Sequence, residues 1–110
     1  MEHLDFVAHS GLGNQDYHCR FVYLQTAISL RHSDTIDVKF LVNGTGVVVA
    51  LPHTAWGEYQ KKKNQALTDE QAAQVAATLL REALERGDNV GLLELNPTAQ
   101  RVVELASQLS

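Results

Sequence analysis

Residues 35–51 read TIDVKFLVNGTGVVVAL, two alternating apolar runs that meet at Asn43-Gly44. Asn-Gly is the preferred dipeptide of a two-residue type I′ turn, in which both central residues have positive φ. A four-residue loop would shift the strand partners by two but keep the same faces together. The two-residue turn pairs Val42 with Thr45, Phe40 with Val47, Val38 with Val49 and Ile36 with Leu51. The stretch therefore predicts two antiparallel strands with one apolar, buried face.

The composition is that of an ordinary globular domain. The chain has 110 residues, of which 45% are hydrophobic and 20% are charged. A chain of this length buries roughly two-thirds of its unfolded surface around one core. We therefore expect residues 1–110 to form a single domain. Nine basic and thirteen acidic residues give a net charge of −4, which disfavours general binding to nucleic-acid backbones.

Cysteine content and the N-terminal residues bear on the cellular compartment. The chain has one cysteine, Cys19, which excludes an intrachain disulfide and fits a reducing environment. The first residues, Met-Glu-His-Leu-Asp, lack the basic start and apolar run of a signal peptide, and no apolar run approaches ~20 residues. These features predict a cytoplasmic protein without a membrane segment.

A third alternating run precedes the hairpin in residues 19–31. The face that we assign to the core carries Arg20, Val22, Leu24, Thr26, Ile28 and Leu30. A three-residue connection, His32-Ser33-Asp34, aligns Leu30 with Ile36 and so keeps this face on the core side. We therefore predict a three-stranded antiparallel meander. Short apolar stretches near residues 4–8 and 90–95 are the candidate strands that extend it.

The second half of the chain shows helical patterns. Residues 53–63 predict one or two helical turns, weakened by Gly57. Thr68-Asp69-Glu70-Gln71 is a capping box, and Gly87 is placed to end the helix that it begins. Exposed ion pairs at helical spacing are expected between Arg81 and Glu85 and between Glu82 and Arg86. The apolar stripe of this helix consists of Ala72, Val75, Ala76, Leu79, Leu80, Ala83 and Leu84.

Another helix is predicted at the end of the chain. Asn96 is a good N-cap, and Pro97 suits the first helical position. The inward side of this helix carries Ala99, Val102, Val103, Ala106 and Leu109. The order of elements predicts an α+β fold, in which two to three helices pack on one face of an antiparallel sheet.

Tyr17-His18-Cys19 is the first candidate for chemistry, because a thiolate beside an imidazole is a nucleophile. Adjacent residues of a strand point to opposite faces, however, so His18 does not serve Cys19 directly. The five histidines show no paired metal-ligand spacing such as His-x3-His. We therefore assign no catalytic residue, no metal site and no cofactor. A small enzyme with a site near Tyr17-His18-Cys19 is kept as an alternative.

The basic cluster Lys61-Lys62-Lys63 follows two aromatic residues, Trp56 and Tyr59. On a helix, Trp56, Tyr59 and Lys63 share one face, which suits stacking on a base or a cation–π contact. The structural interpretation is that both rings anchor a short helix on the sheet and that the lysines form its solvated end. Nucleic-acid or regulatory binding through Trp56-Tyr59 and Lys61-Lys63 is a second alternative, disfavoured by the net charge.

The remaining face of the predicted meander is more apolar than the face that an antiparallel sheet normally presents to water. Either the N-terminal segment or a second copy of the chain is expected to cover it. It carries Phe21, Tyr23, Ala27, Leu41, Val48 and Ala50 among Gln25, Ser29, Asp37 and Lys39. We predict a non-catalytic, homodimeric binding module whose interface contains Phe21, Tyr23, Leu41 and Val48. The sequence leaves its partner or ligand, a protein or a small molecule, unassigned.

Overall fold

A computed structural model describes residues 4–9, 16–27, 34–86 and 94–109 of the chain. The described elements are β1 (Phe6–His9), β2 (Asp16–Ala27), β3 (Thr35–Val42), β4 (Thr45–Pro52), α1 (Thr54–Lys63), α2 (Asp69–Arg86), β5 (Glu94–Leu95) and α3 (Ala99–Leu109). The strands form one sheet in the order β1-β2-β3-β4-β5, antiparallel except between β4 and β5. The predicted α+β fold is confirmed, and strands at both edges extend the meander.

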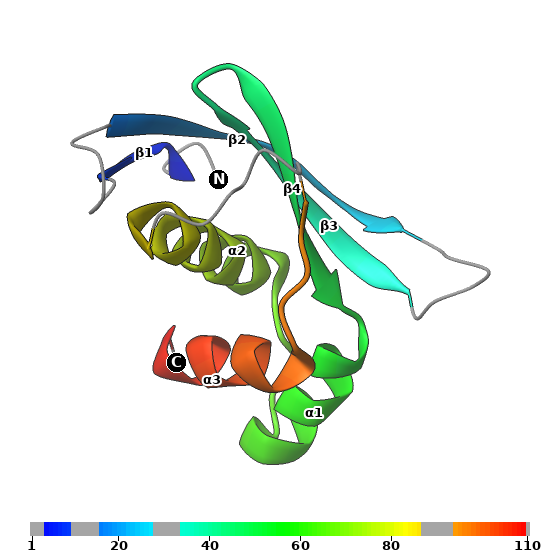
Figure 1. The fold of residues 1–110 in the computed structure, drawn as a ribbon. Coiled ribbons are helices and arrows are strands. Elements are labelled where there is room, and N and C mark those ends of the chain that lie inside the picture. Colours follow the sequence, from blue (N-terminus) through cyan, green and yellow to red (C-terminus); the bar gives the residue numbers. More distant parts are fainter. Residues whose placement is uncertain (1–3, 10–15, 28–33, 87–93, 110) are drawn as a thin grey trace.

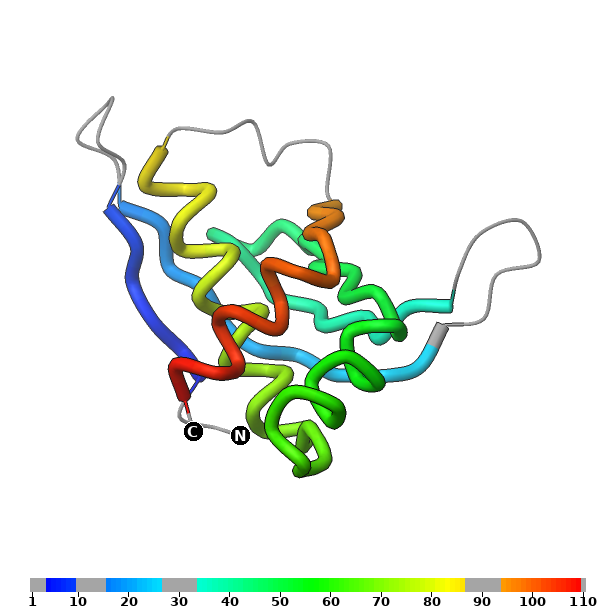
Figure 2. The backbone as a smooth tube through the Cα atoms, turned by 90° about the horizontal axis from the view of Figure 1, so that it is seen from below, coloured from blue at the N-terminus to red at the C-terminus, as the bar shows by residue number. Residues whose placement is uncertain are grey.

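The helices α1, α2 and α3 all lie on one side of the curled sheet (Figure 1). α3 lies between the other two helices and contacts both of them (Figure 2). α2 contacts β1, β2 and β4, whereas α1 packs mainly against α3. Among the described residues, no helix has the length and apolar character needed to cross a membrane. The fold is therefore a two-layer arrangement with one helix-covered face of the sheet.

The central hairpin has the predicted turn and register. Asn43 has a φ of 50° and Gly44 a φ of 85°, which is the left-handed geometry of a type I′ turn. The partners are those predicted from the sequence, from Val42 with Thr45 to Ile36 with Leu51. Asn and Gly are the residues that adopt positive φ at low cost, so the turn sequence and the strand pattern specify the same register.

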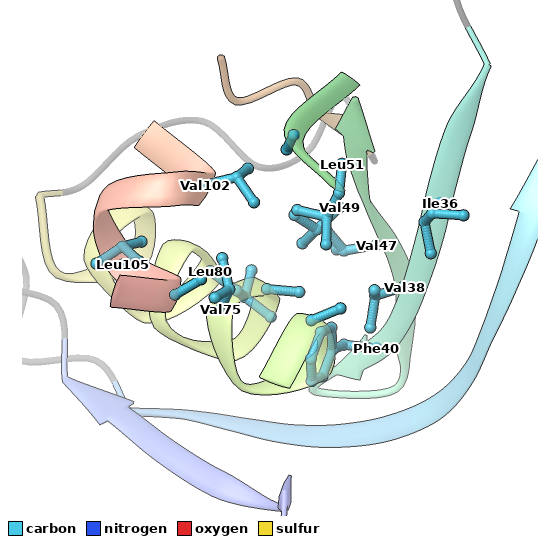
Figure 3. Close-up of a cluster of buried hydrophobic side chains, with 14 of the residues drawn as sticks. Ile36, Val38, Phe40, Val47, Val49, Leu51, Val75, Leu80, Val102 and Leu105 are labelled. Carbon is cyan, nitrogen blue, oxygen red and sulfur yellow. The ribbon is translucent and has the colours of Figure 1, made fainter. Parts of the chain in front are cut away.

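The core lies between the hairpin and the helices α2 and α3. The labelled side chains of β3 and β4 point toward those of α2 and α3 (Figure 3). Phe40 is fully buried, and the rings of Phe6 and Phe21 meet it edge-on at centroid distances of 6.1 and 6.0 Å. Burying each large apolar side chain contributes about 1.5–3 kcal/mol. The central side chains are Val38, Phe40, Val47, Val49, Val75, Leu80, Val102 and Leu105.

The pairing of β2 with β3 differs from the predicted one. Thr26, rather than Leu30, lies opposite Ile36, and Leu24 lies opposite Val38. The register along β2 is therefore shifted by four residues from the predicted one. Leu24 and Thr26 lie on the core side of β2, as predicted. Residues 28–33, which include the predicted core positions Ile28 and Leu30, lie outside the described part of the chain.

A β-bulge changes the facing of β2 at Val22. Phe21 lies opposite Phe40, and the next paired residue is Tyr23, opposite Lys39. The extra residue reverses the alternation, so Phe21 and Cys19 point toward the core. The predicted placement of Arg20 and Val22 on the core side is therefore wrong.

The capping box at the start of α2 is confirmed. The Gln71 N–H donates to Thr68 Oγ1 at 3.1 Å, and the Thr68 N–H donates to Gln71 Oε1 at 3.0 Å. α1 is longer than the predicted one or two turns and ends at Asn64, which has a φ of 55°. The buried residues of α2 are Ala72, Ala73, Val75, Ala76, Leu80, Ala83 and Leu84. Gly87 lies outside the described residues.

The last helix begins later than predicted. Thr98 caps α3, because its Oγ1 accepts the Arg101 N–H at 3.1 Å. The predicted start at Asn96-Pro97 is therefore wrong: the chain is still extended through Leu95, which pairs with Val49 in the sheet. Leu109, predicted to face inward, is exposed at the end of the helix. The buried residues of α3 are Val102, Val103, Leu105 and Ala106.

Two charged side chains of α2 have partners outside that helix. Glu82 binds Arg101 of α3, with Arg101 Nη2 at 2.9 and 2.5 Å from the two carboxylate oxygens. The Arg81 guanidinium lies over the ring of Phe6 at 4.8 Å from the centroid. The predicted pair of Arg81 with Glu85 is therefore replaced by a contact with β1. Tertiary contacts, rather than spacing along the helix, select these partners.

Candidate interaction surface

The outer face of the sheet is the face opposite the three helices. Val38, Phe40 and Val42 point into the core, so the residues between them on β3 point outward. The pairing register then places their neighbours from β2, β4 and β5 beside them. The resulting outer face contains Arg20, Tyr23, Gln25, Asp37, Lys39, Leu41, Gly46, Val48, Ala50 and Glu94.

Three of the four predicted interface residues lie on this outer face. Tyr23 is opposite Lys39, Lys39 is opposite Val48, and Leu41 is opposite Gly46. Tyr23, Leu41 and Val48 are half-buried by their neighbours in the sheet. They therefore lie around Lys39, on a face that combines apolar and charged side chains.

Phe21 does not belong to the outer face. The bulge at Val22 turns its ring toward the core, where it meets Phe40 at 6.0 Å. The expected outward position of Phe21 is therefore wrong. In its place the bulge leaves Val22 exposed, with 43% of its surface accessible. Strict alternation along the sequence does not reveal an inserted residue, which is why the prediction failed here.

Lys39 lies at the centre of the outer face. Its ammonium is 5.8 Å from the centroid of the Tyr23 ring, a distance at which a cation and an aromatic face attract. Its side chain also passes over Gly46, where an added Cβ would lie 3.0 Å from Lys39 Cε. A side chain at position 46 would therefore have to displace Lys39. Asp37, two residues earlier on the same face, accepts the Thr35 hydroxyl at 2.8 Å.

The described N-terminal segment does not cover the outer face. β1 pairs edge to edge with the start of β2, with Phe6 opposite Cys19 and Ala8 opposite Tyr17. It thus adds a strand to the sheet instead of crossing it. Because α1, α2 and α3 lie on the other side (Figure 1), no helix in the described ranges covers the outer face either.

The Tyr17-His18-Cys19 segment holds a buried thiol. Cys19 is 3% exposed, and its Sγ lies 3.7 Å from the carbonyl oxygen of Tyr17. Burial raises the pKa of the Cys19 thiol to about 11, and the Arg81 charge opposes this rise only in part. The thiol is therefore protonated at neutral pH, which does not suit a nucleophile. His18 is exposed on the opposite side of the strand.

The aromatic and basic residues of α1 differ in their exposure to solvent. Tyr59 is fully buried and belongs to the hydrophobic core, so its ring offers no surface for a base. Trp56 is half-buried and stacks on His53, with ring centroids 6.1 Å apart and planes 9° apart. Lys61, Lys62 and Lys63 are exposed in the last turn of the helix. Tyr59 is therefore not available on a solvent-exposed face together with Trp56 and Lys63.

No group of three or more His, Cys, Asp or Glu side chains in the described ranges is arranged to hold a metal ion. Comparison of the chain with protein-family profiles, curated protein sequences and solved structures gave no significant match.

Proposed function

We propose that the protein is a non-catalytic binding module that forms a homodimer through the outer face of its sheet. The observation that carries this proposal is the position of β1 at the sheet edge, with all helices on the opposite side. Tyr23, Leu41 and Val48 are left without a cover from the described elements. A second copy of the same face buries these side chains in both molecules.

The charged residues Asp37 and Lys39 make the outer face self-complementary. Asp37 and Lys39 are two residues apart on β3 and point to the same face. A two-fold axis through the face between them brings Lys39 of each copy toward Asp37 of the other. Each contact of such an isologous interface occurs twice. These opposite charges favour two copies related by the two-fold axis. They disfavour two copies whose β3 strands point in the same direction, because like charges would then face each other.

The state of Cys19 supports a role in binding rather than in catalysis. The raised pKa of its thiol and its burial leave it without the properties of an activated nucleophile. The ordinary role for such a residue is packing in the hydrophobic core, where it contributes as a small apolar side chain.

Light scattering after gel filtration tests the dimer. At micromolar concentration the wild-type chain should have about twice the 12.1 kDa mass of one chain. Leu41→Lys or Tyr23→Lys should give a folded monomer, because the interface would then bury a lysine at this position without a counter-charge. Leu109→Lys is the matched control, since Leu109 is exposed on the helix side, and this variant should remain dimeric.

Two results would contradict the proposed dimer. One is a wild-type protein that stays monomeric at high concentration. The other is a Leu41→Lys variant that remains dimeric, because this would place the interface elsewhere. Circular dichroism of each variant establishes that a change in mass is not caused by unfolding.

A further inference from the structure

A groove lies on the helix side of the molecule, at the edge where β1 meets α2. Its volume is about 290 Å³. The residues lining it come from the start of the chain, from α2 and from the end of α3: Leu4, Phe6, Gln74, Ala77, Thr78, Arg81 and Leu109. The groove is thus formed by three segments that are far apart in the sequence.

A cation that has no acidic partner among the described residues lies in this groove. Arg81 is exposed and forms no ion pair with any residue of the described ranges. Its guanidinium lies over the Phe6 ring at 4.8 Å, and this cation–π contact orients the group. The edge of a guanidinium in this orientation keeps its N–H donors available for an anion, for which a carboxylate is the matching planar acceptor.

The remainder of the groove is mainly apolar. Leu4 and Phe6 form one wall, Ala77 contributes from α2, and Leu109 lies at the end of α3 with 44% of its surface exposed. Thr78 already donates its hydroxyl to the carbonyl oxygen of Gln74 at 3.0 Å. The groove therefore combines one oriented positive charge with apolar side chains beside it.

We propose that this groove binds a small aliphatic carboxylate, with its carboxylate on Arg81 and its chain between Phe6 and Leu109. The charge selects an anion, and the apolar walls select a hydrocarbon chain over an inorganic ion. The volume lies just below the usual range of about 300–1,000 Å³ for ligand pockets. It therefore suits a medium-chain acid such as octanoate and is small for a cofactor.

This site is separate from the proposed dimer face. The groove lies between β1, α2 and α3, whereas the dimer face is the other side of the sheet. Ligand binding and self-association are consequently tested by different variants. The ligand-binding proposal can fail while the dimer proposal holds, and the reverse is also possible.

Calorimetric titration with sodium octanoate, below its micellar range, tests the proposal. Octanoate should bind the wild-type protein at one saturable site per chain. Butanoate should bind at least about tenfold more weakly, because it buries four fewer methylene groups. Octan-1-ol, which has the chain without the charge, should also bind about tenfold more weakly than octanoate.

Arg81→Gln isolates the contribution of the charge. This variant should bind octanoate about tenfold more weakly and octan-1-ol with unchanged affinity. Glutamine retains the helix propensity of arginine, and circular dichroism checks that the fold is kept. Lys62→Gln is the matched control: it removes one positive charge from an exposed position on α1 and should leave both affinities unchanged.

Amide chemical shifts locate the bound acid independently of affinity. Octanoate should shift the amide signals of Phe6, Ala77 and Leu109, and Leu109→Ser should weaken octanoate binding more than butanoate binding. The proposal is overturned by the absence of saturable octanoate binding to the wild type. Equal octanoate affinity of the wild type and Arg81→Gln overturns it as well, as does a shift pattern confined to residues outside the groove.

Discussion

Asn43 and His18 form a reciprocal pair of hydrogen bonds that ties the hairpin turn to the neighbouring strand. The Asn43 N–H donates to the carbonyl oxygen of His18 at 2.9 Å. The His18 N–H in turn donates to the side-chain Oδ1 of Asn43, also at 2.9 Å. Asn43 therefore has two roles, because it also adopts the positive φ that the turn requires.

Substitutions at Asn43 should separate these two roles. Asn43→Gly keeps the positive φ but removes the acceptor for His18, and should reduce the free energy of unfolding by about 1 kcal/mol. Asn43→Ala adds a left-handed backbone penalty of about 1–2 kcal/mol and should cost about 2–3 kcal/mol in total. Urea denaturation measures both.

The matched control for the turn is Asn64→Gly. Asn64 also has a positive φ, at the end of α1, and its backbone N–H binds Gln60. Glycine is favoured at this position, so the substitution should change stability by less than about 0.5 kcal/mol. Equal losses at Asn43 and Asn64 would show that the hydrogen bond to His18 contributes nothing.

Phe40 is the side chain on which the core should depend most. It is fully buried between Phe6 and Phe21, so Phe40→Ala should reduce the free energy of unfolding by about 3–5 kcal/mol. This is a large part of the 5–15 kcal/mol typical of a domain. Phe40→Leu, which keeps most of the apolar volume, should cost markedly less. A loss below about 1 kcal/mol for Phe40→Ala would contradict the assigned face.

The hairpin was predictable because two independent signals agree in residues 35–51. Asn43-Gly44 specifies the turn, and apolar alternation on both sides specifies the same face. In residues 19–27 the two faces are similarly apolar: Cys19, Phe21 and Tyr23 alternate with residues such as Val22 and Leu24. Alternation alone therefore did not determine which face of β2 points toward the core. The bulge at Val22 is selected by packing against Phe40, and the sequence of a single strand does not encode such a contact with another strand.

The candidate sites show the same distinction between local and long-range information. Tyr23, Leu41 and Val48 were placed on the outer face by strand parity, and the structure agrees. The groove at Arg81 was not predicted, because helical spacing pairs Arg81 with Glu85 and gives no sign of Phe6. Residues 6 and 81 meet only through the packing of α2 on β1.

The Cys19 thiol predicts a loss of stability in alkaline solution. Its pKa is raised from 9.0 to about 11 by burial, so the folded state holds the proton more tightly than the unfolded state. The contribution of the protonated thiol to the free energy of unfolding is complete below pH 9. It is lost as the pH rises from 9 to 11, and this loss is at most about 3 kcal/mol. Denaturation curves of wild type and Cys19→Ala across this range isolate the effect from other titrating groups.

Chemical labelling provides a second measurement on the same residue. A thiol reagent should react slowly with Cys19 in the native protein at pH 7 and rapidly after unfolding. Rapid reaction of the folded protein would show an accessible thiolate, and would support the alternative of an enzyme with a site near Tyr17-His18-Cys19.

The ion pair between Glu82 and Arg101 joins α2 to α3. The hydrogen bond to Glu82 is the main reason why the pKa of Arg101 is raised. Both side chains are about one-third exposed, so water and salt screen the pair. Glu82→Gln should therefore cost only about 0.5–1 kcal/mol, and less in 1 M salt. Glu85→Gln, an exposed position on the same helix, should have almost no effect on the unfolding midpoint.

Exchange of the charges on β3 provides a specific test of the two-fold interface. In the proposed dimer, Lys39 of each copy lies near Asp37 of the other. Lys39→Asp would place like charges across the axis, and should weaken dimerisation in analytical ultracentrifugation. Asp37→Lys alone should do the same.

The combined variant Asp37→Lys/Lys39→Asp should recover much of the lost association, since it restores opposite charges across the axis. A simple loss of the Lys39 contact with Tyr23 does not predict this recovery, because the double variant lacks that contact too. Recovery should diminish as salt is added, because the partly exposed pair is screened. Additive losses in the double variant would place Asp37 and Lys39 away from the axis and contradict the proposed geometry.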